Sequence, residues 1–206
     1  MSPEDQRRYL EIAKNHSERL GRLVAKLFEL AKLDSGEVQV HNEPFPIAEL
    51  IQDVTQEFEL TAEKRGIAIE TDLQNTGVFV SADIGLIERV LENLLDNALS
   101  YTPEGGSVRL TLSATDDQVC IQVADTGCGI APEETARIFD RFYRVEKSRP
   151  PNAQGAGLGL AIAKRILELH GSPITVDSAL NAGTTFAFAL PACRPGPDYP
   201  RKMSAA

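Results

Sequence analysis

The stretch QGAGLGLAIAKRI, residues 154–166, places three glycines at alternate positions and then continues without a break into a helical pattern. Glycine is unfavourable inside helices and strands, so Gly155, Gly157 and Gly159 indicate a sharp bend or a close approach to the backbone. The amide groups and the dipole at the start of a helix favour an anion there. The stretch lacks the GK[ST] ending of a Walker loop, and it follows a loop where a dinucleotide fold needs a strand. It therefore predicts an anion site of a different kind.

The composition of the 206-residue chain is that of a globular protein with an acidic surface. Hydrophobic residues make up 42% of the chain, and 21 Lys and Arg against 30 Asp and Glu give a net charge of -9. Such a charge repels nucleic acid, so we expect no nucleic-acid partner and local positive groups wherever an anion binds. Sparse cysteines without metal spacing, and no apolar run of membrane-spanning length, predict a cytoplasmic location. A beginning inside a helical pattern suggests a longer parent, whose attachment to the inner membrane stays open.

Residues 1–36 are predicted to form one long helix with an apolar seam. Apolar and small side chains recur at alternating steps of three and four from Leu10 to Ala31, as in a bundled helix. Such a stripe needs partner helices from a second copy or an upstream segment, unless the helix lies on the core of its own domain. Ser35 and Gly36 end the helix, and residues 37–46, with two prolines, read as a linker.

Residues 47–192 alternate between helical and strand patterns and predict a separate α+β domain. Helices are expected at 47–64, 84–99 and 158–169, and strands at 66–73, 77–82, 108–115, 118–125, 173–179 and 183–191. Glycine, proline and charge between residues 125 and 157 predict a mobile loop. Residues 193–206 contain too few apolar side chains to pack and are predicted to be a disordered tail.

Asn93 and Asn97 lie four residues apart on one face of the expected helix 84–99, where both interrupt an apolar stripe. Carboxamides that face a core need hydrogen-bond partners, or they face a ligand. Asparagine oxygens can ligate Mg²⁺, which also binds nucleotide phosphates. Core hydrogen bonding and a magnesium site both agree with this spacing.

The segment ADTGCGI, residues 124–130, ends a hydrophobic strand with a carboxylate, Asp125. A carboxylate that is buried there needs a specific donor, and the amino group of a purine is one. Gly127 and Gly129 would let a flat ring lie against the backbone. An ordinary turn after a strand explains the same residues.

The segment IFDRFYRVEKSR, residues 138–149, concentrates positive charge in an acidic protein. It combines two phenylalanines with four cations: Phe139, Phe142, Arg141, Arg144, Lys147 and Arg149. Such a cluster suits phosphate oxygens through charge-assisted hydrogen bonds, although a solvated loop has the same composition.

The order of these segments, completed by AGTTF at residues 182–186, is more specific than any one of them. Together they resemble the ATP-binding catalytic domain of sensor histidine kinases, in the superfamily of gyrase, chaperone, kinase and mismatch-repair ATPases. The resemblance covers residues 45–191. It implies a two-layer α/β sandwich of the Bergerat type, with a mixed sheet packed on helices and one long bundle helix before it.

The resemblance also implies a role for individual residues. Asn97 corresponds to the Mg²⁺ ligand, Asn93 assists at the phosphates, and Asp125 recognises the amino group of adenine. Tyr101 and Thr184 lie beside the nucleotide. The expected catalytic residues are Asn93, Arg144, Arg149 and Gln154. The remaining nucleotide-binding candidates are Gly127, Gly129, Ile130, Gly155, Gly157, Leu158, Gly159 and Leu160.

One departure from the family concerns Ser100, which stands where a phosphate-contacting lysine is common. Affinity for ATP is then weaker, or another cation substitutes. His16 lacks the acidic neighbour and the later proline of the family's phosphoacceptor, so we expect a surface residue. His41 and His170 are expected to be structural.

The function that the resemblance implies is that of an ATP-dependent histidine kinase in two-component signalling. The chain would bind Mg-ATP and pass the γ-phosphoryl group to a histidine, for relay to an aspartate of a response regulator. Its first helix resembles the second helix of the dimerisation and phosphotransfer hairpin, so a homodimer is expected, with the helix that bears the acceptor absent and no self-labelling.

Two alternatives stay open. One is a superfamily ATPase or serine kinase, and the other is a non-catalytic, ATP-sensing dimerisation module. Relatives that hydrolyse ATP carry a glutamate base where this chain has Asn93, which favours the kinase.

Overall fold

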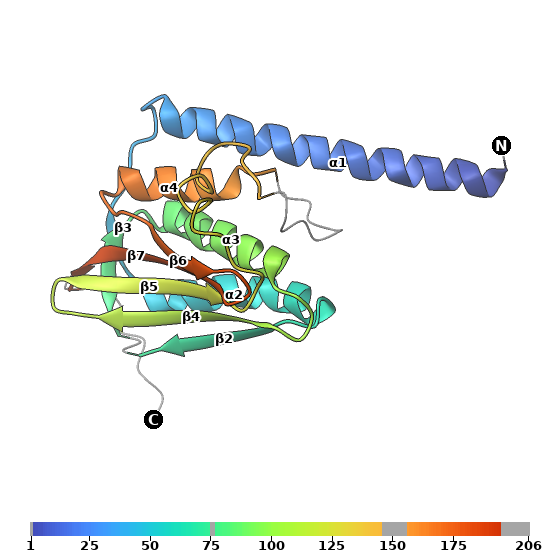
Figure 1. Cartoon of the computed structure of the whole chain (residues 1–206). Coiled ribbons are helices and arrows are strands. Elements are labelled where there is room, and N and C mark those ends of the chain that lie inside the picture. The colour runs from blue at the N-terminus through green and yellow to red at the C-terminus, as the bar shows by residue number, and fades with distance from the viewer. Residues whose placement is uncertain (1, 75–76, 146–155, 195–206) are drawn as a thin grey trace.

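The computed structural model describes residues 2–74, 77–145 and 156–194, and these form one sheet, three helices packed beside it and a long outer helix (Figure 1). The helices are α1 (Pro3–Asp34), α2 (Ile47–Lys64), α3 (Ile84–Tyr101) and α4 (Gly159–Leu169). The strands are β1 (Glu43–Pro46), β2 (Ala68–Leu73), β3 (Phe79–Ala82), β4 (Ser107–Ala114), β5 (Gln118–Asp125), β6 (Thr175–Ala179) and β7 (Gly183–Cys193). Every helix and strand expected from the sequence is present, with ends that differ by a few residues at most.

The sheet is mixed, as expected. Its strand order is β1-β3-β7-β5-β4-β2, with β6 paired to β7, and only the pair of β2 and β4 is parallel among the described strands. Helices α2 and α3 lie over one face, α4 packs against α3, and α1 crosses above α4 (Figure 1). This arrangement is the two-layer α/β sandwich preceded by a long helix.

The pairing of β5 with β7 carries the centre of the core. Side chains of directly paired residues point to the same face of a sheet, and on one face of this pair they are all buried. The buried pairs are Val119 with Leu190, Ile121 with Phe188, Val123 with Phe186, and Asp125 with Thr184. The polar pair therefore continues the apolar ladder at the end of β5.

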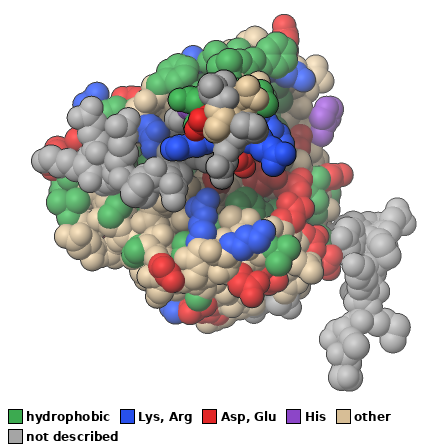
Figure 2. Space-filling model, turned by 90° about the vertical axis from the view of Figure 1, so that its right-hand side faces the viewer, with side chains coloured by type: hydrophobic (Ala, Val, Ile, Leu, Met, Phe, Trp, Pro, Cys, Tyr) green, Lys and Arg blue, Asp and Glu red, His purple; other side chains and the backbone are tan. Residues whose placement is uncertain are grey.

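The outer helix α1 presents two different faces. Near its C-terminal end Leu30 and Leu33 are only 2% and 3% exposed and belong to the core of the domain. The expected seam remains on the outside, where Leu20 and Val24 are 62% and 59% exposed. Figure 2, in which α1 is seen nearly end-on, shows hydrophobic side chains exposed at the top of the molecule. One face of this helix therefore packs on the core of its own domain, as one alternative predicted. The other face carries the exposed apolar seam, for which the other alternative predicted partner helices.

Ion pairs hold the same end of α1 on the domain. Both oxygens of Glu29 accept from Arg89 of α3, at 2.8 and 3.0 Å. Asp34 pairs with Arg165 of α4 at 3.3 Å and also contacts Arg141. The docking of α1 therefore combines buried leucines with partly exposed charges. None of the described helices is long and apolar enough to cross a membrane.

Two expectations about the ends of the domain need correction. The linker 37–46 contains β1, a four-residue strand that pairs with β3 although it holds two prolines. At the other end, β7 extends to Cys193, the first residue of the expected tail, and this residue pairs with Phe79 of β3. Residues 195–206 of that tail lie outside the described residues.

Candidate nucleotide site

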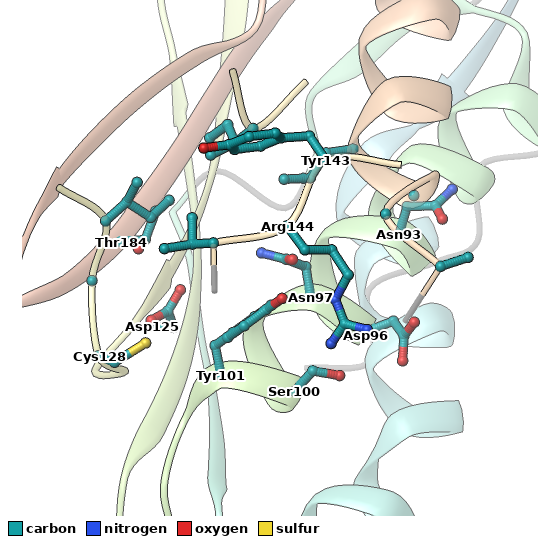
Figure 3. A pocket seen from close by; sticks show the side chains of 18 of the residues that line it. Asn93, Asp96, Asn97, Ser100, Tyr101, Asp125, Cys128, Tyr143, Arg144 and Thr184 are labelled. Atoms are coloured by element: carbon teal, nitrogen blue, oxygen red, sulfur yellow. The ribbon is translucent and has the colours of Figure 1, made fainter. Parts of the chain in front are cut away.

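A cavity opens between α3, the ends of β5 and β7, and the segment that leads into α4 (Figure 3). Eleven of the residues expected at a nucleotide line it together: Asn93, Asn97, Tyr101, Asp125, Gly129, Ile130, Arg144, Gly157, Gly159, Leu160 and Thr184. These residues come from distant parts of the sequence, and the fold brings them to one hollow. Gly127 and Leu158 do not line it, and Leu158 is fully buried in the core. Arg149, Gln154 and Gly155 lie outside the described residues.

Asp125 forms one end of the cavity. It is the last residue of β5 and is 7% exposed, in agreement with its position after a hydrophobic strand. Burial raises the pKa of its carboxyl group, while backbone hydrogen bonds from Gly127 and Thr184 oppose that rise. The result is a desolvated acceptor beside an apolar wall, suited to one well-placed donor such as an amino group on a ring.

Asn93 and Asn97 lie on α3, Asn93 on the side of the cavity away from Asp125 and Asn97 between the two (Figure 3). Asn93 is 4% exposed, and its Nδ2 donates to the carbonyl oxygen of Arg89 at 2.8 Å. A β-carbon on Gly159 would lie 2.9 Å from Oδ1 of Asn93, so the start of α4 rests against this carboxamide. Asn93 therefore makes the hydrogen bond expected of a buried carboxamide, and it also lines the cavity. Asn97 is half-buried one turn further on.

The glycines are required mainly by the protein's own backbone. A β-carbon on Gly129 would lie 1.9 Å from the carbonyl oxygen of Ala179, and one on Gly127 would lie 2.5 Å from that of Tyr101. From the sequence, we expected these two glycines to make room for a flat ring. In the structure, another segment of the backbone passes too close to each of them for a side chain to fit. Gly157 has φ +70° and would meet the backbone of Phe142 at 2.8 Å, so the opening stretch does mark a close approach.

The basic segment divides between the cavity and α1. Arg144 lines the cavity, and its guanidinium points toward Asp96 (Figure 3). Arg141 instead pairs with Asp34 of α1, so its expected contact with an anion is corrected to a contact between helix and domain. Phe139 packs edge-on against Phe186, with ring centroids 6.2 Å apart. Lys147 lies outside the described residues.

Several lining residues were not expected from the sequence. They are Lys26, Asp96, Cys128, Ile138, Tyr143, Val145 and Ala156. Ser100 also lines the cavity, at the position where the resemblance implies a phosphate contact. Lys26 belongs to α1, and only the missing cation at position 100 hinted that a charge must come from elsewhere. The described residues contain no group of three His, Cys, Asp or Glu side chains that could hold a metal.

The expected roles of the three histidines agree with their surroundings where the structure describes them. Nε2 of His170 accepts from the backbone N–H of Asp83 at 3.1 Å, which ties the end of α4 to the start of α3. His41 donates its backbone N–H to Asp83 at 3.0 Å. His16 lies on the exposed part of α1.

The sheet, the helices above it and the cavity at the ends of β5 and β7 define an ATPase catalytic domain of the sensor histidine kinase class. The chain belongs to the family of histidine kinase-, DNA gyrase B- and HSP90-like ATPases, whose model matches residues 82–194.

Individual relatives agree with this family. Sensor histidine kinase WalK of Bacillus subtilis is 38% identical over 186 residues, which cover 89% of this chain and 30% of the relative. Sensor protein SrrB of Staphylococcus aureus is 38% identical over 189 residues, with coverages of 92% and 32%. The chain thus spans about a third of the length of these relatives.

Solved structures show the same architecture. Full-length ShkA in complex with AMPPNP matches with a TM-score of 0.79 and 33% identity, over 91% of this chain and 39% of that one. Histidine kinase ThkA in complex with response regulator protein TrrA matches with a TM-score of 0.75 and 29% identity, over 93% and 52%. Both matches include part of α1, because the 172 residues that follow α1 are fewer than the 91% and 93% of the 206-residue chain that the matches cover.

Proposed function

We propose that this chain binds Mg-ATP and transfers the γ-phosphoryl group to a histidine, for relay to an aspartate of a response regulator. The observation that carries the proposal is one cavity with the buried carboxylate of Asp125 on one side, Asn93 and the guanidinium of Arg144 on the other, and Asn97 between them (Figure 3). That separation of chemistry suits a nucleotide, which has a neutral ring with an amino group at one end and anionic phosphates at the other. ShkA was solved with AMPPNP, which supports a nucleotide in the same fold.

The base end would be formed by Asp125 and its neighbours. Asp125 would accept a hydrogen bond from the amino group of adenine, with Thr184 paired beside it in β7. Ile130 and Tyr101 would supply apolar and aromatic surface. Because the carboxyl group is desolvated, its hydrogen bond to the base is stronger than the same bond in water. We assign adenine selectivity to this end.

The phosphate end would be formed by Asn97, Asn93 and Arg144. A carboxamide oxygen fits Mg²⁺ when phosphate oxygens and water supply the other ligands, which agrees with the absence of a dense carboxylate cluster among the described residues. When bound, Mg²⁺ would neutralise charge on the triphosphate. Arg144 would orient the terminal phosphates by charge-assisted hydrogen bonds. Phosphoryl transfer needs mainly such positioning and charge stabilisation.

Two observations support the partners that we propose, which are a second copy of this chain and a response regulator. The exposed seam of α1 offers an apolar face for a second copy, with Leu10, Leu20, Val24 and Leu27 between 45% and 70% exposed. We propose a homodimer through this face. ThkA was solved with its response regulator TrrA, which supports a receiver domain as the acceptor's partner.

A hydrolase or serine kinase has less support. No glutamate lines the cavity within the described part of the chain. Glu92, the neighbour of Asn93, instead binds Arg89 at 2.6 Å on another side of α3. Position 93 carries a carboxamide, and the two carboxylates in the lining are Asp125 and Asp96, which pairs with Lys26.

The proposal is tested in two steps. First, Mg-ATP is titrated calorimetrically into the wild type and Asn97→Ala, and the variant should bind about tenfold more weakly. Second, the wild type is incubated with γ-labelled ATP and a supplied helix hairpin that bears an acceptor histidine. Label on the histidine of the hairpin supports the kinase. Binding without transfer would leave an ATP-sensing module, and label on His16 would contradict the assignment of a separate acceptor.

A further inference from the structure

The cavity is lined not only by the ATPase domain but also by a lysine from the outer helix. Lys26 of α1 belongs to the same lining as Asn97 and Arg144. Its side chain is 28% exposed, and its Nζ lies 3.9 Å from Oδ2 of Asp96 on α3. Two opposite charges 3.9 Å apart form an ion pair, but this distance is too long for a hydrogen bond. Asp96 therefore does not occupy the N–H groups of Lys26, which can donate to other acceptors.

The charges near Asp96 are unbalanced. Asp96 pairs with Lys26. The guanidinium of Arg144 also points toward Asp96 (Figure 3). Two cations thus gather at one end of a cavity in a protein with a net charge of -9. Ser100, in the same part of the lining, carries no charge. Lys26 and Arg144 are the only cations among the described residues that line this cavity.

We propose that Lys26 binds phosphate oxygens of the nucleotide, so that α1 completes the site that the ATPase domain begins. The proposal rests on the proposed function, because it needs a nucleotide in this cavity. A triphosphate carries more negative charge than the single carboxylate of Asp96, and the flexible ammonium group can turn from one to the other. Asp96 then holds Lys26 near the phosphate end while the nucleotide is absent.

The position of Lys26 depends on the docking of α1. Leu30 lies one turn after Lys26 and is buried, and Glu29 forms the bidentate contact with Arg89. When α1 leaves the domain, Lys26 leaves the cavity with it. Docking of α1 and binding of the triphosphate should therefore strengthen each other by the same factor. The affinity for ATP then reports the position of a helix outside the ATPase domain.

The test compares Lys26→Ala with Lys32→Ala by calorimetric titration of Mg-ATP, Mg-ADP and adenosine. Lys32 is an exposed lysine of the same helix that does not line the cavity, so both variants lose one positive charge. We expect Lys26→Ala to bind Mg-ATP about tenfold more weakly, because one charge-assisted contact is lost, and to bind adenosine as the wild type does. Lys32→Ala should bind all three as the wild type does, and Lys26→Arg should retain most of the affinity.

The outcomes separate the two proposals. Equal affinity for Mg-ATP in Lys26→Ala and Lys32→Ala would overturn the role of Lys26. An equal loss for Mg-ATP and adenosine would also overturn it, since the phosphates would not be involved. Failure of the wild type to bind any of the three ligands would refute the nucleotide site itself.

A second experiment tests the coupling. The double variant Glu29→Ala, Leu30→Ala weakens the docking of α1 without touching the cavity lining. It should lower the affinity for Mg-ATP as Lys26→Ala does, and adding Lys26→Ala to it should cause little further loss. Full additivity of the two effects would contradict a shared cause. Thermal unfolding of the same samples checks that the ATPase domain remains folded.

Discussion

The backbone N–H of Gly127 donates a hydrogen bond of 2.8 Å to Oδ1 of Asp125, two residues earlier in the chain. This bond holds the carboxylate at the end of β5, where the side chain is almost fully buried. Asp125→Asn keeps an oxygen for Gly127 but loses the charge that would attract an amino group. We expect its affinity for ATP to fall about tenfold or more. Titration with inosine triphosphate, which lacks that amino group, is the control, and its affinity should change much less.

We expect the same substitution, which weakens the binding of ATP, to stabilise the folded protein relative to the wild type as the pH rises. Burial raises the pKa of Asp125 in the folded state above its ordinary value. The folded state then holds the proton more tightly than the unfolded state, so the contribution of this group to stability is lost as pH rises through the folded pKa. Urea unfolding of the wild type and Asp125→Asn should show the variant gaining relative stability from pH 4 to pH 7. A constant or reversed difference between the two proteins would count against the pKa shift.

Asn97→Ala separates the metal from the nucleotide. If Asn97 holds Mg²⁺ at the phosphates, the wild type should bind ATP more tightly with Mg²⁺ than with a chelator. The variant should lose about a factor of ten in the presence of Mg²⁺ and little in its absence. An equal loss under both conditions would show that Asn97 contacts the nucleotide directly.

Gly129→Ala tests a chain crossing beside the cavity. The new methyl group would lie 1.9 Å from the carbonyl oxygen of Ala179, at a φ of +66°. We expect a loss of about 3 kcal/mol or more in the free energy of unfolding, measured with urea. Gly21→Ala is the matched control, because no atom lies within 4 Å of the added carbon in α1. It should leave the stability unchanged or raise it by up to about 1 kcal/mol.

The exposed seam of α1 predicts an oligomer. Leu20→Asp combined with Leu27→Asp places charges on this face, and light scattering should show a homodimer becoming a monomer. Leu60→Asp is the control, since Leu60 is 67% exposed on α2, away from the seam. A wild type that is already monomeric at high concentration would contradict the proposed dimer.

The regular elements followed from local patterns. The helix Ile47–Lys64 has the bounds expected from its sequence, because its apolar residues recur at helical spacing directly after Pro46. The strand β1 was missed, since four residues with two prolines give no alternating pattern and pair only because β3 is nearby. Local periodicity is informative about an element, whereas a short edge strand depends on its neighbour.

A feature of the site could be predicted when its physical cause lay within one short segment of the sequence. The burial of Asp125 followed from its place at the end of an apolar strand. The steric need for glycine at positions 127 and 129 could not be predicted in this way. The backbone carbonyl groups of Tyr101 and Ala179 come close to these positions only in the folded chain. Lys26 lies still further away, on a helix assigned to a different domain. Contacts between elements distant in sequence leave no periodic signal that a single sequence can reveal.

The pairing of Asp125 with Thr184 at the end of the β5–β7 ladder has one more consequence. A slip of one residue would turn Asp125 to the opposite face, and a slip of two in one direction would set it beside Phe186. If Asp125 reads the base, discrimination between adenine and guanine nucleotides depends on the alignment of two whole strands. A preference for adenine would then be a sensitive assay for correctly assembled molecules in any preparation, including one whose circular dichroism looks native.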